Sequence, residues 1–296
     1  YDQGTYGALE RLPQGAYDTH EGLPIECFWR IVAKQTILAA GALERSIAFA
    51  DNDRPGIMTA GAVRTYLNRW GVAPGQKIVV FGNNDDAHRT AQDLVAAGIE
   101  VAALVDSRPE ADANGDFPIY AGSMICGSRG RHGLKSVQLQ RLDGTTDTIE
   151  ADCLAVSGGW NPTVHMTCHM NGRPKWQPEI ASFIPVPKTI PGLFAAGACN
   201  GVFSTHRCLQ EGHLAANAAL SALKIKIKKT PIPKAEDQGY SISALWAVPG
   251  EARAWVDLQN DVTVKDIKQA AVESYSSVEH MKRYTTQGMA PDQGKN

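Results

Sequence analysis

The chain has 296 residues, of which 43% are hydrophobic, so it is long enough to bury the cores of two domains. Its 29 basic and 31 acidic residues nearly cancel, which excludes a strong electrostatic attraction to nucleic acid or to an anionic membrane. No apolar run approaches the roughly 20 residues that a membrane-spanning helix needs, and the first residues show no export signal.

The cysteines and the chain ends add two expectations. The six cysteines lack CxxC and CxC spacing, which argues against a dithiol redox pair or a zinc knuckle and favours free thiols in a reducing cytoplasm. The chain starts with Tyr and ends in a polar stretch, so we expect a piece of a longer polypeptide. The cysteines are Cys27, Cys126, Cys153, Cys168, Cys199 and Cys208.

The first predicted elements are two strands and a helix. Residues 28–42 are rich in β-branched and aromatic side chains in near-alternation, which predicts two short strands around a polar turn, the second ending at Gly41. Residues 59–71 place apolar side chains on one helical face, with Thr59 as the N-cap and Gly71 as the stop.

Residues 77–108 have the order of a dinucleotide-binding βαβ unit. A buried strand at 77–81 is followed by a turn, a helix from about residue 86 to 97, Gly98 as its stop, and a second buried strand at 100–105. Asp106 lies 24 residues after Gly82, where a ribose-binding carboxylate would lie.

The turn of this unit departs from the nucleotide-binding fingerprint. Of the glycines only Gly82 remains, and Asn84 puts a side chain where backbone must approach a phosphate. Asp85 and Asp86 add negative charge at the helix N-terminus, which repels a pyrophosphate. The unit is either a nucleotide site or a retained Rossmann-like scaffold without one, and these residues favour the scaffold.

Further along the chain the pattern predicts a hairpin, a strand and a long helix. The hairpin turns at Asp143-Gly144, the strand runs into the Gly-rich turn of residues 192–201, and the helix covers residues 205–223. The charged, Pro-containing stretch 224–240 is expected to be a linker. After it come a short strand and two short helices, too small a set for an independent core, so we expect them to pack on another part of the protein.

Two strands end in small residues, where a backbone can approach a ligand closely. They are "TILAAGALERS" (36–46) and "GLFAAGACNG" (192–201), and they flank the βαβ unit in sequence. This arrangement describes one Rossmann-type domain interrupted by another. The alternative is that the small residues serve tight packing alone.

Two groups of His and Cys residues are candidate sites by residue type. His165, Cys168 and His169 would share a helix face, but no fourth metal ligand is evident. His206 and Cys208 would need an Asp or Asn to orient the imidazole, and none is apparent from spacing. We therefore predict neither a metal site nor a catalytic residue in the chain.

Several long stretches resemble the alpha subunit of heterotetrameric sarcosine oxidase. They are "ILAAGALERSIAFADNDRPGIMTAGAVRTYLNRWGVAPGQKIVVFGNNDDAHRTAQDL", "AVSGGWNPTVHMTCH", "GLFAAGACNG" and "SVEHMKRYTTQGMAPDQGK". That family has the two-dinucleotide-binding-domain flavoprotein architecture of thioredoxin reductases, opine oxidase subunits and hydrogen cyanide synthase subunits. The resemblance implies an α/β fold in which a Rossmann-like domain is interrupted by a second one, plus a small α+β C-terminal unit.

On this basis we expect four parts. Residues 1–72 and 156–223 form the first, incomplete NAD-binding-type domain, 73–155 the inserted degenerate Rossmann-like domain, 224–240 the linker, and 241–296 the small domain. The resemblance implies that an upstream Gly-fingerprint segment and a downstream tetrahydrofolate-binding domain lie outside these residues.

The resemblance also implies the site residues. The NAD site would use the two strand ends, where Ala40 replaces the family's usual Thr, and where Cys199 and Asn200 replace the Asp that binds ribitol in related flavoproteins. That replacement favours a ligand other than FAD. The NAD-binding residues would be Ala40, Gly41, Ala42, Gly197, Ala198, Asn200 and Gly201.

The C-terminal unit resembles a domain that carries a two-iron cluster in related enzymes, but residues 209–296 contain no cysteine to ligate iron. The stretch 56–63, where thioredoxin reductases carry their reactive CxxC, also lacks cysteine, which argues against disulfide exchange. In the family this small unit faces an FMN shared with the beta subunit. Phosphate donors there would be Lys282, Arg283, Thr285, Thr286 and Gln293, and the alternative is a solvated basic helix face.

The resemblance implies that the whole enzyme oxidises sarcosine to glycine. Hydride passes to FAD in the beta subunit, electrons pass through FMN to oxygen to give hydrogen peroxide, and the one-carbon unit is captured as methylene-tetrahydrofolate. This chain would complete the NAD pocket, wall one side of the FMN site and hold the beta, gamma and delta subunits. Its NAD would carry no hydride in the reaction. The alternatives are a subunit of an opine or other secondary-amine oxidase or dehydrogenase, and a structural assembly module with degenerate nucleotide sites.

Overall fold

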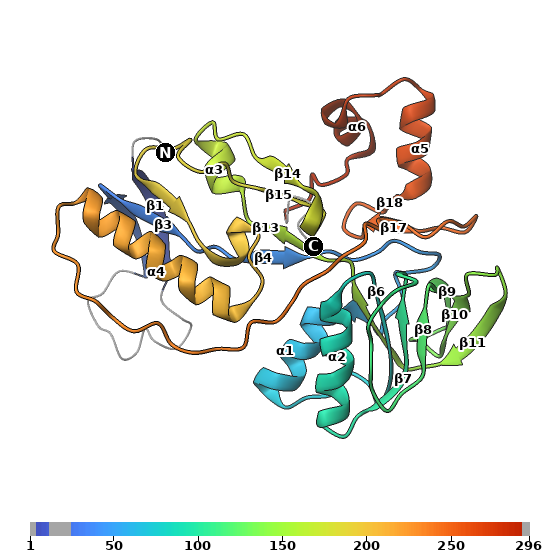
Figure 1. The fold of residues 1–296 in the computed structure, drawn as a ribbon. Helices are drawn as coiled ribbons and strands as arrows, with labels where there is room; N and C mark the ends of the chain where they lie inside the picture. The colour runs from blue at the N-terminus through green and yellow to red at the C-terminus, as the bar shows by residue number, and fades with distance from the viewer. Residues whose placement is uncertain (1–3, 12–24, 292–296) are drawn as a thin grey trace. The chain divides into compact units, whose positions relative to one another are not determined.

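The computed structural model describes residues 4–11 and 25–291 and has the predicted α/β fold, in two compact units (Figure 1). The first unit takes in the described residues up to Ala42, with Pro162–Gln177 and Ser182–Gln238. The second takes in Leu43–Asn161, Pro178–Ala181 and the described residues from Gly239 on.

A five-stranded parallel sheet forms the centre of the second unit, in the order β5-β12-β6-β7-β8. The strands are β5 (Ile57–Thr59), β6 (Lys77–Gly82), β7 (Glu100–Asp106), β8 (Ile119–Ala121) and β12 (Cys153–Ser157). Helices α1 (Ala60–Trp70) and α2 (Asp85–Ala96) lie side by side on one face of it (Figure 1). A second, antiparallel sheet is built from β9 (Met124–Arg129), β10 (Ser136–Gln140) and β11 (Thr146–Glu150).

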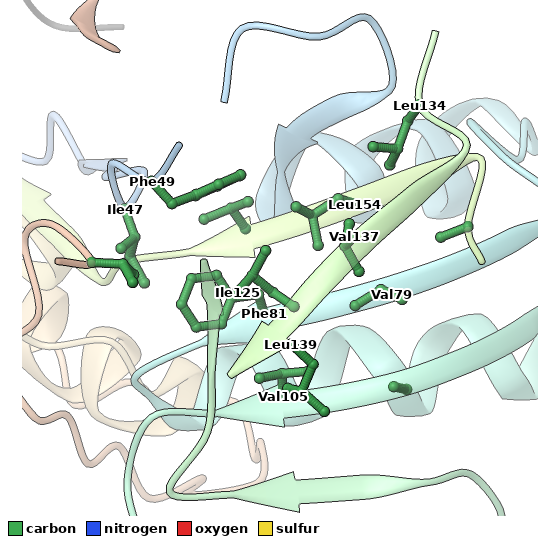
Figure 2. Packing of buried hydrophobic residues seen from close by; sticks show 14 residues of the cluster. Ile47, Phe49, Val79, Phe81, Val105, Ile125, Leu134, Val137, Leu139 and Leu154 are labelled. Atoms are coloured by element: carbon green, nitrogen blue, oxygen red, sulfur yellow. The ribbon is translucent and has the colours of Figure 1, made fainter. Parts of the chain in front are cut away.

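The core of this unit follows from the two-residue period of the strands. In β6, Ile78 and Val80 belong to the buried cluster that includes α1 and α2, whereas Val79 and Phe81 belong to the cluster that includes β9 and β10. Figure 2 shows Val79, Phe81 and Val105 meeting side chains of the antiparallel sheet. Because both faces are covered, the strand reads as a continuous apolar run, as in other parallel sheets.

The helix boundaries of this unit confirm the sequence predictions. Gly71 and Gly98 follow their helices with φ of 64° and 78°, the left-handed backbone that glycine adopts without steric cost. Thr59 is the N-cap of α1, but its side chain makes no capping bond. A carboxylate oxygen of Glu44 accepts the N–H of Gly61 instead, at 2.6 Å.

The first unit contains shorter elements. Its parallel pair is β3 (Thr36–Leu38) with β16 (Leu193–Ala195), against which α4 (Thr205–Ala222) packs. β1 (Thr5–Arg11) pairs antiparallel with β2 (Glu26–Val32), and β14 (Lys175–Gln177) with β15 (Ser182–Ile184). The remaining elements of this unit are α3 (His165–His169) and the 3₁₀ turn Gly197–Asn200. β4 (Ala42–Glu44) pairs with β13 (Trp160–Pro162), and these strands lie mostly in the second unit, as does the 3₁₀ turn Pro178–Ile180.

The C-terminal segment forms β17 (Trp255–Asp257), β18 (Val262–Thr263), α5 (Val264–Val272) and α6 (Val278–Thr285). Thr263 and Asp266 form a capping box on α5, in which the Asp266 carboxylate accepts the N–H of Thr263 at 2.8 Å and the Thr263 side chain accepts the N–H of Asp266. Asn52 exchanges two hydrogen bonds with the backbone of Trp255, so the segment packs on the second unit.

The borders of the compact units differ from those drawn on the sequence. The predicted first domain included residues 57–70, but β5 pairs with β12 and α1 packs on α2, which places both in the second unit. The predicted linker 224–240 has neither helix nor strand. Across the part of the chain that the structure describes, no helix is both long and apolar enough to cross a membrane.

Candidate functional site

The two small-residue strand ends of the first unit lie together. β3 and β16 run parallel with Leu38 opposite Ala195, and the N–H of Ala196 donates to the Leu38 carbonyl at 3.0 Å. Both strands therefore end at the same edge of the sheet, the carboxyl edge. Open α/β sheets bind ligands at this edge. This juxtaposition brings residues 40–42 and 197–201 to one edge of the sheet.

A single carboxylate holds the second of these ends. Glu211, the one acidic residue of α4, accepts the N–H of Gly197 at 2.8 Å with one oxygen and the side-chain amide of Asn200 at 3.0 Å with the other. Gly197 and Gly201 have φ of 75° and 80°, so the turn needs glycine at both positions. Glu211 was not among the residues predicted from the sequence; its only signal there is that it is a lone acid on the helix after a Gly-rich turn.

A cavity of about 480 Å³ adjoins this turn within the first unit. Its polar lining includes Asn200 and Glu211, and much of the rest comes from the apolar segment 185–195 and from Leu214 and Ala218 of α4. A mostly apolar pocket with a few polar groups on its lining is typical of a small-molecule site.

The first strand end leaves room for a ligand. Gly41 has φ of 73°, and no atom lies within 4 Å of the position that a side-chain carbon would take there. Its carbonyl accepts the N–H of Thr163 at 3.0 Å. Cys199 is buried and its Sγ donates to the Leu38 carbonyl at 3.0 Å, so the thiol joins the two strand ends.

The residues predicted to bind the FMN phosphate do not converge in the same way. Arg283 pairs with Glu279 one turn earlier at 2.8 Å, and the hydroxyls of Thr285 and Thr286 donate to backbone carbonyls. Of the described members only Lys282 lines the nearby cavity of about 270 Å³. Gln293 lies outside the described residues.

That cavity also contains the carboxylate of Asp257. Backbone N–H groups of Gln259, Asn260 and Gly288 donate to it at 2.8–3.0 Å. Burial raises the pKa of Asp257, but these hydrogen bonds outweigh burial and hold the pKa below its usual value. A fixed negative charge beside Lys282 does not suit a phosphate, so these residues do not fit an FMN phosphate site by themselves.

The turn of the inserted βαβ unit is filled by its own side chains. Asn84 is fully buried, and its amide donates to the carbonyl and the hydroxyl of Ser157 at 3.0 and 3.1 Å and to Asn83 at 2.9 Å. The side chain thus occupies the space over which a glycine would let a phosphate approach.

Asp106, the acid expected to bind ribose, is already bonded to other side chains. Asp106 is fully buried and contacts His88 at 2.5 Å and the Arg108 guanidinium at 2.8 Å. Burial raises the pKa of Asp106, but the bonds from His88 and Arg108 outweigh it and lower the pKa below its usual value. Arg108 also pairs with Asp85 at 2.7 Å, and Asp86 pairs with Arg89 at 2.5 Å.

The candidate residues His206 and Cys208 each bond to another partner, and Cys208 lies beside the Gly197 turn. His206 bonds to Gln210 at 2.8 Å, while the Cys208 thiol donates to the Val202 carbonyl at 3.1 Å. Burial, with the nearby Glu211 carboxylate, raises the pKa of Cys208, which disfavours a reactive thiolate. Within residues 4–11 and 25–291, no three His, Cys, Asp or Glu side chains gather as a metal site.

Solved structures show the class of fold to which this arrangement belongs. L-Proline dehydrogenase from P. horikoshii matches 90% of this chain and 52% of its own, with a TM-score of 0.66 and 19% identity. Thioredoxin reductase from T. acidophilum matches 66% of this chain and 67% of its own, with a TM-score of 0.54 and 14% identity. The fold is the Rossmann-like fold of FAD- and NAD-dependent oxidoreductases.

Sequence relatives narrow this class. The sarcosine oxidase alpha subunit of Rhizobium meliloti (strain 1021) is 43% identical over all of this chain and 30% of its own length, and that of Corynebacterium sp. (strain P-1) is 37% identical over all of this chain and 33% of its own. An opine oxidase subunit of Rhizobium meliloti (strain 1021) is 23% identical over 88% of this chain and 67% of its own length. The family described as "Sarcosine oxidase A3 domain" matches residues 251–296. The chain belongs to the sarcosine oxidase alpha-subunit family and spans about a third of the length of these alpha subunits.

Proposed function

We propose that this chain is the NAD-holding part of a sarcosine oxidase alpha subunit. The enzyme would oxidise sarcosine to glycine, reduce oxygen to hydrogen peroxide and form methylene-tetrahydrofolate, with FAD, FMN and tetrahydrofolate bound largely by other parts of a cytoplasmic complex with beta, gamma and delta subunits. The chain carries no amine-oxidising residue in this proposal. Its role is to bind and to position.

The paired strand ends carry the proposal. They lie at the carboxyl end of a parallel pair, which is the edge where dinucleotides bind in open α/β sheets. The open space at Gly41 and the left-handed turn at Gly197 allow a ligand to approach the backbone, so the residues present fit a dinucleotide. NAD would supply binding energy and order to this edge, because it carries no hydride here.

For FMN we propose a narrower role than the resemblance implied. Lys282 would face the flavin site from its cavity, while Arg283, Thr285 and Thr286 would serve the helix that carries it. The principal contacts to the FMN phosphate would then come from other residues of the complex.

A pair of glycine variants tests the NAD site in the complete enzyme. Gly197→Ala places a side-chain carbon on a residue with φ of 75°, a conformation that costs alanine about 1–2 kcal/mol. The turn should therefore move away from the geometry that binds NAD, and the affinity for NAD should fall. Gly212→Ala is the matched control, because Gly212 lies in α4 with open space around it and should leave NAD affinity unchanged. Equal NAD affinity in both variants would contradict the proposed site.

The substrate is tested by turnover. Peroxide formation with sarcosine, and little with opines, supports the proposal; the reverse preference would favour an opine oxidase subunit, the second candidate that the relatives suggest. The absence of cysteine from residues 209–296 argues against the second candidate, because its relatives need those ligands for a cluster.

A further inference from the structure

Residues 239–243, called here the strap, lie along the carboxyl end of the five-stranded sheet of the second unit. The carbonyl of Ser241 accepts the N–H of Asp85 at 3.2 Å and a guanidinium N–H of Arg108 at 2.9 Å. The N–H of Ser241 donates back to the Asp85 carboxylate at 2.7 Å. Ser241 of the strap and Asp85 of the turn therefore each donate a hydrogen bond to the other.

The contact continues on both sides of Ser241. Ile242 forms an antiparallel bridge with Asn84, and the N–H of Ser243 donates to the Asn83 carbonyl at 3.0 Å. On the other side, Arg89 of α2 donates to the carbonyl of Gly239. The strap is thus seated by backbone groups along most of its length.

Side chains fix the strap as well. A carbon added at Gly159, which has φ of 97°, would collide with a methyl of Ile242 and lie 3.3 Å from the hydroxyl of Tyr240. Gly159 therefore makes room for both side chains. Burial raises the pKa of Tyr240, as expected of a phenol taken out of water.

The strap completes the hydrogen bonding of the helix N-terminus that a phosphate would otherwise use. The first three N–H groups of α2 are all bonded: that of Asp85 to Ser241, that of Asp86 to the Asn84 side chain at 3.0 Å, and that of Ala87 to the Asn84 carbonyl at 3.3 Å. A pyrophosphate needs free N–H groups and a positive counter-charge. Arg89 and Arg108 could supply that charge, but they are already paired with the carboxylates of Asp86 and Asp85.

We infer that the carboxyl edge of the five-stranded sheet is a peptide-binding site filled in cis by the strap, at the position where a Rossmann-like unit binds a dinucleotide. The site recognises an extended peptide backbone through Asn83, Asp85 and Arg108. It therefore accepts no second nucleotide, and electrons from free NADPH cannot enter the enzyme through this unit. The inference is independent of NAD binding by the first unit.

Hydrogen exchange in the complete enzyme, read by mass spectrometry, tests the strap. Ser241→Pro removes the N–H that Asp85 accepts, and amides of residues 83–90 should then exchange about tenfold faster or more. Ser241→Ala, at an exposed position, keeps the backbone bonds and should leave exchange unchanged. Unchanged exchange at residues 83–90 in Ser241→Pro would overturn the inference.

Two further readouts keep the test decisive. Hydrogen exchange in peptides of β9–β11 reports global unfolding. If Ser241→Pro unfolds this sheet, Ser243→Pro replaces it as the test variant. Ser243→Pro removes the bond to the Asn83 carbonyl, and the same increase in exchange at residues 83–90 is expected. Saturating NADPH added to the unmodified enzyme should leave exchange at residues 83–90 unchanged. Protection of those residues by NADPH would show a nucleotide in the place assigned to the strap.

Discussion

Glu44 should make the second unit less stable as pH rises. Its carboxyl group is buried and accepts hydrogen bonds from the N–H of Gly61 and the hydroxyl of Ser157, the latter at 2.9 Å. Burial dominates these bonds and raises the pKa of Glu44 to about 7, from 4.5 for an ordinary Glu. Because the folded state then binds a proton more tightly than the unfolded state, the stabilising contribution is complete below pH 4.5 and is lost as pH rises through 7.

The size of this effect follows from the two pKa values. Between pH 5.5 and pH 8 the linkage relation gives a loss of about 2 kcal/mol from this one group. Glu44→Gln removes the titration while keeping an acceptor for Gly61, so the variant should lack that part of the pH dependence. The assay is urea unfolding of the complete enzyme at both pH values. Hydrogen exchange in peptides from β6 and β12 gives the urea midpoint of the second unit.

The exposed Glu110 provides the control, since Glu110→Gln should leave the pH dependence as in the unmodified protein. If Glu44→Gln and the unmodified protein lose the same stability between pH 5.5 and pH 8, the reasoning from burial is wrong.

Three further predictions concern a buried ion pair, a helix cap and the proposed NAD site. Arg108→Ala leaves the buried Asp106 carboxylate short of a partner and should destabilise the second unit by about 3 kcal/mol. Arg141→Ala breaks a solvent-exposed pair and should destabilise it far less; urea unfolding distinguishes the two variants. Thr263→Ala removes the capping box of α5 and should cost about 1 kcal/mol, visible as faster exchange in α5 alone. Glu211→Ala removes the carboxylate that accepts bonds from Gly197 and Asn200, so it should weaken NAD binding. Glu211→Gln keeps one acceptor and should recover part of the affinity. Equal NAD affinity in the unmodified enzyme and both variants would show that Glu211 does not position the NAD site.

Local pattern was enough to predict most elements. The βαβ unit could be read from residues 77–105 because apolar runs, a helical period and the stop at Gly98 are all encoded within a few residues of where they act. The sequence assigned the two small-residue strand ends to one interrupted Rossmann-type domain, and the structure adds that their strands pair in parallel.

Contacts between distant residues could not be predicted in this way. Asp85 and Ser241 are 156 positions apart, and no periodicity or spacing pairs an exposed serine with a helix N-terminus. The pairing of β5 with β12 is another such contact, because nothing in the local pattern of residues 57–59 indicates a strand almost 100 positions later as its neighbour.

The FMN residues illustrate a different limit. Lys282, Arg283, Thr285 and Thr286 were chosen because their residue types suit a phosphate. A threonine in a helix, however, can donate to the carbonyl four positions earlier, as Thr285 does to Met281 at 2.9 Å. Residue type alone therefore does not tell which side chains are available to a phosphate.

The NAD content of the complete enzyme tests the central claim most directly. The enzyme, purified without added nucleotide, is denatured in acid and the released NAD is quantified against the concentration of the alpha chain. The paired strand ends predict close to one NAD for each alpha chain. An NAD content near zero would contradict the account and favour an assembly module whose nucleotide sites are all degenerate.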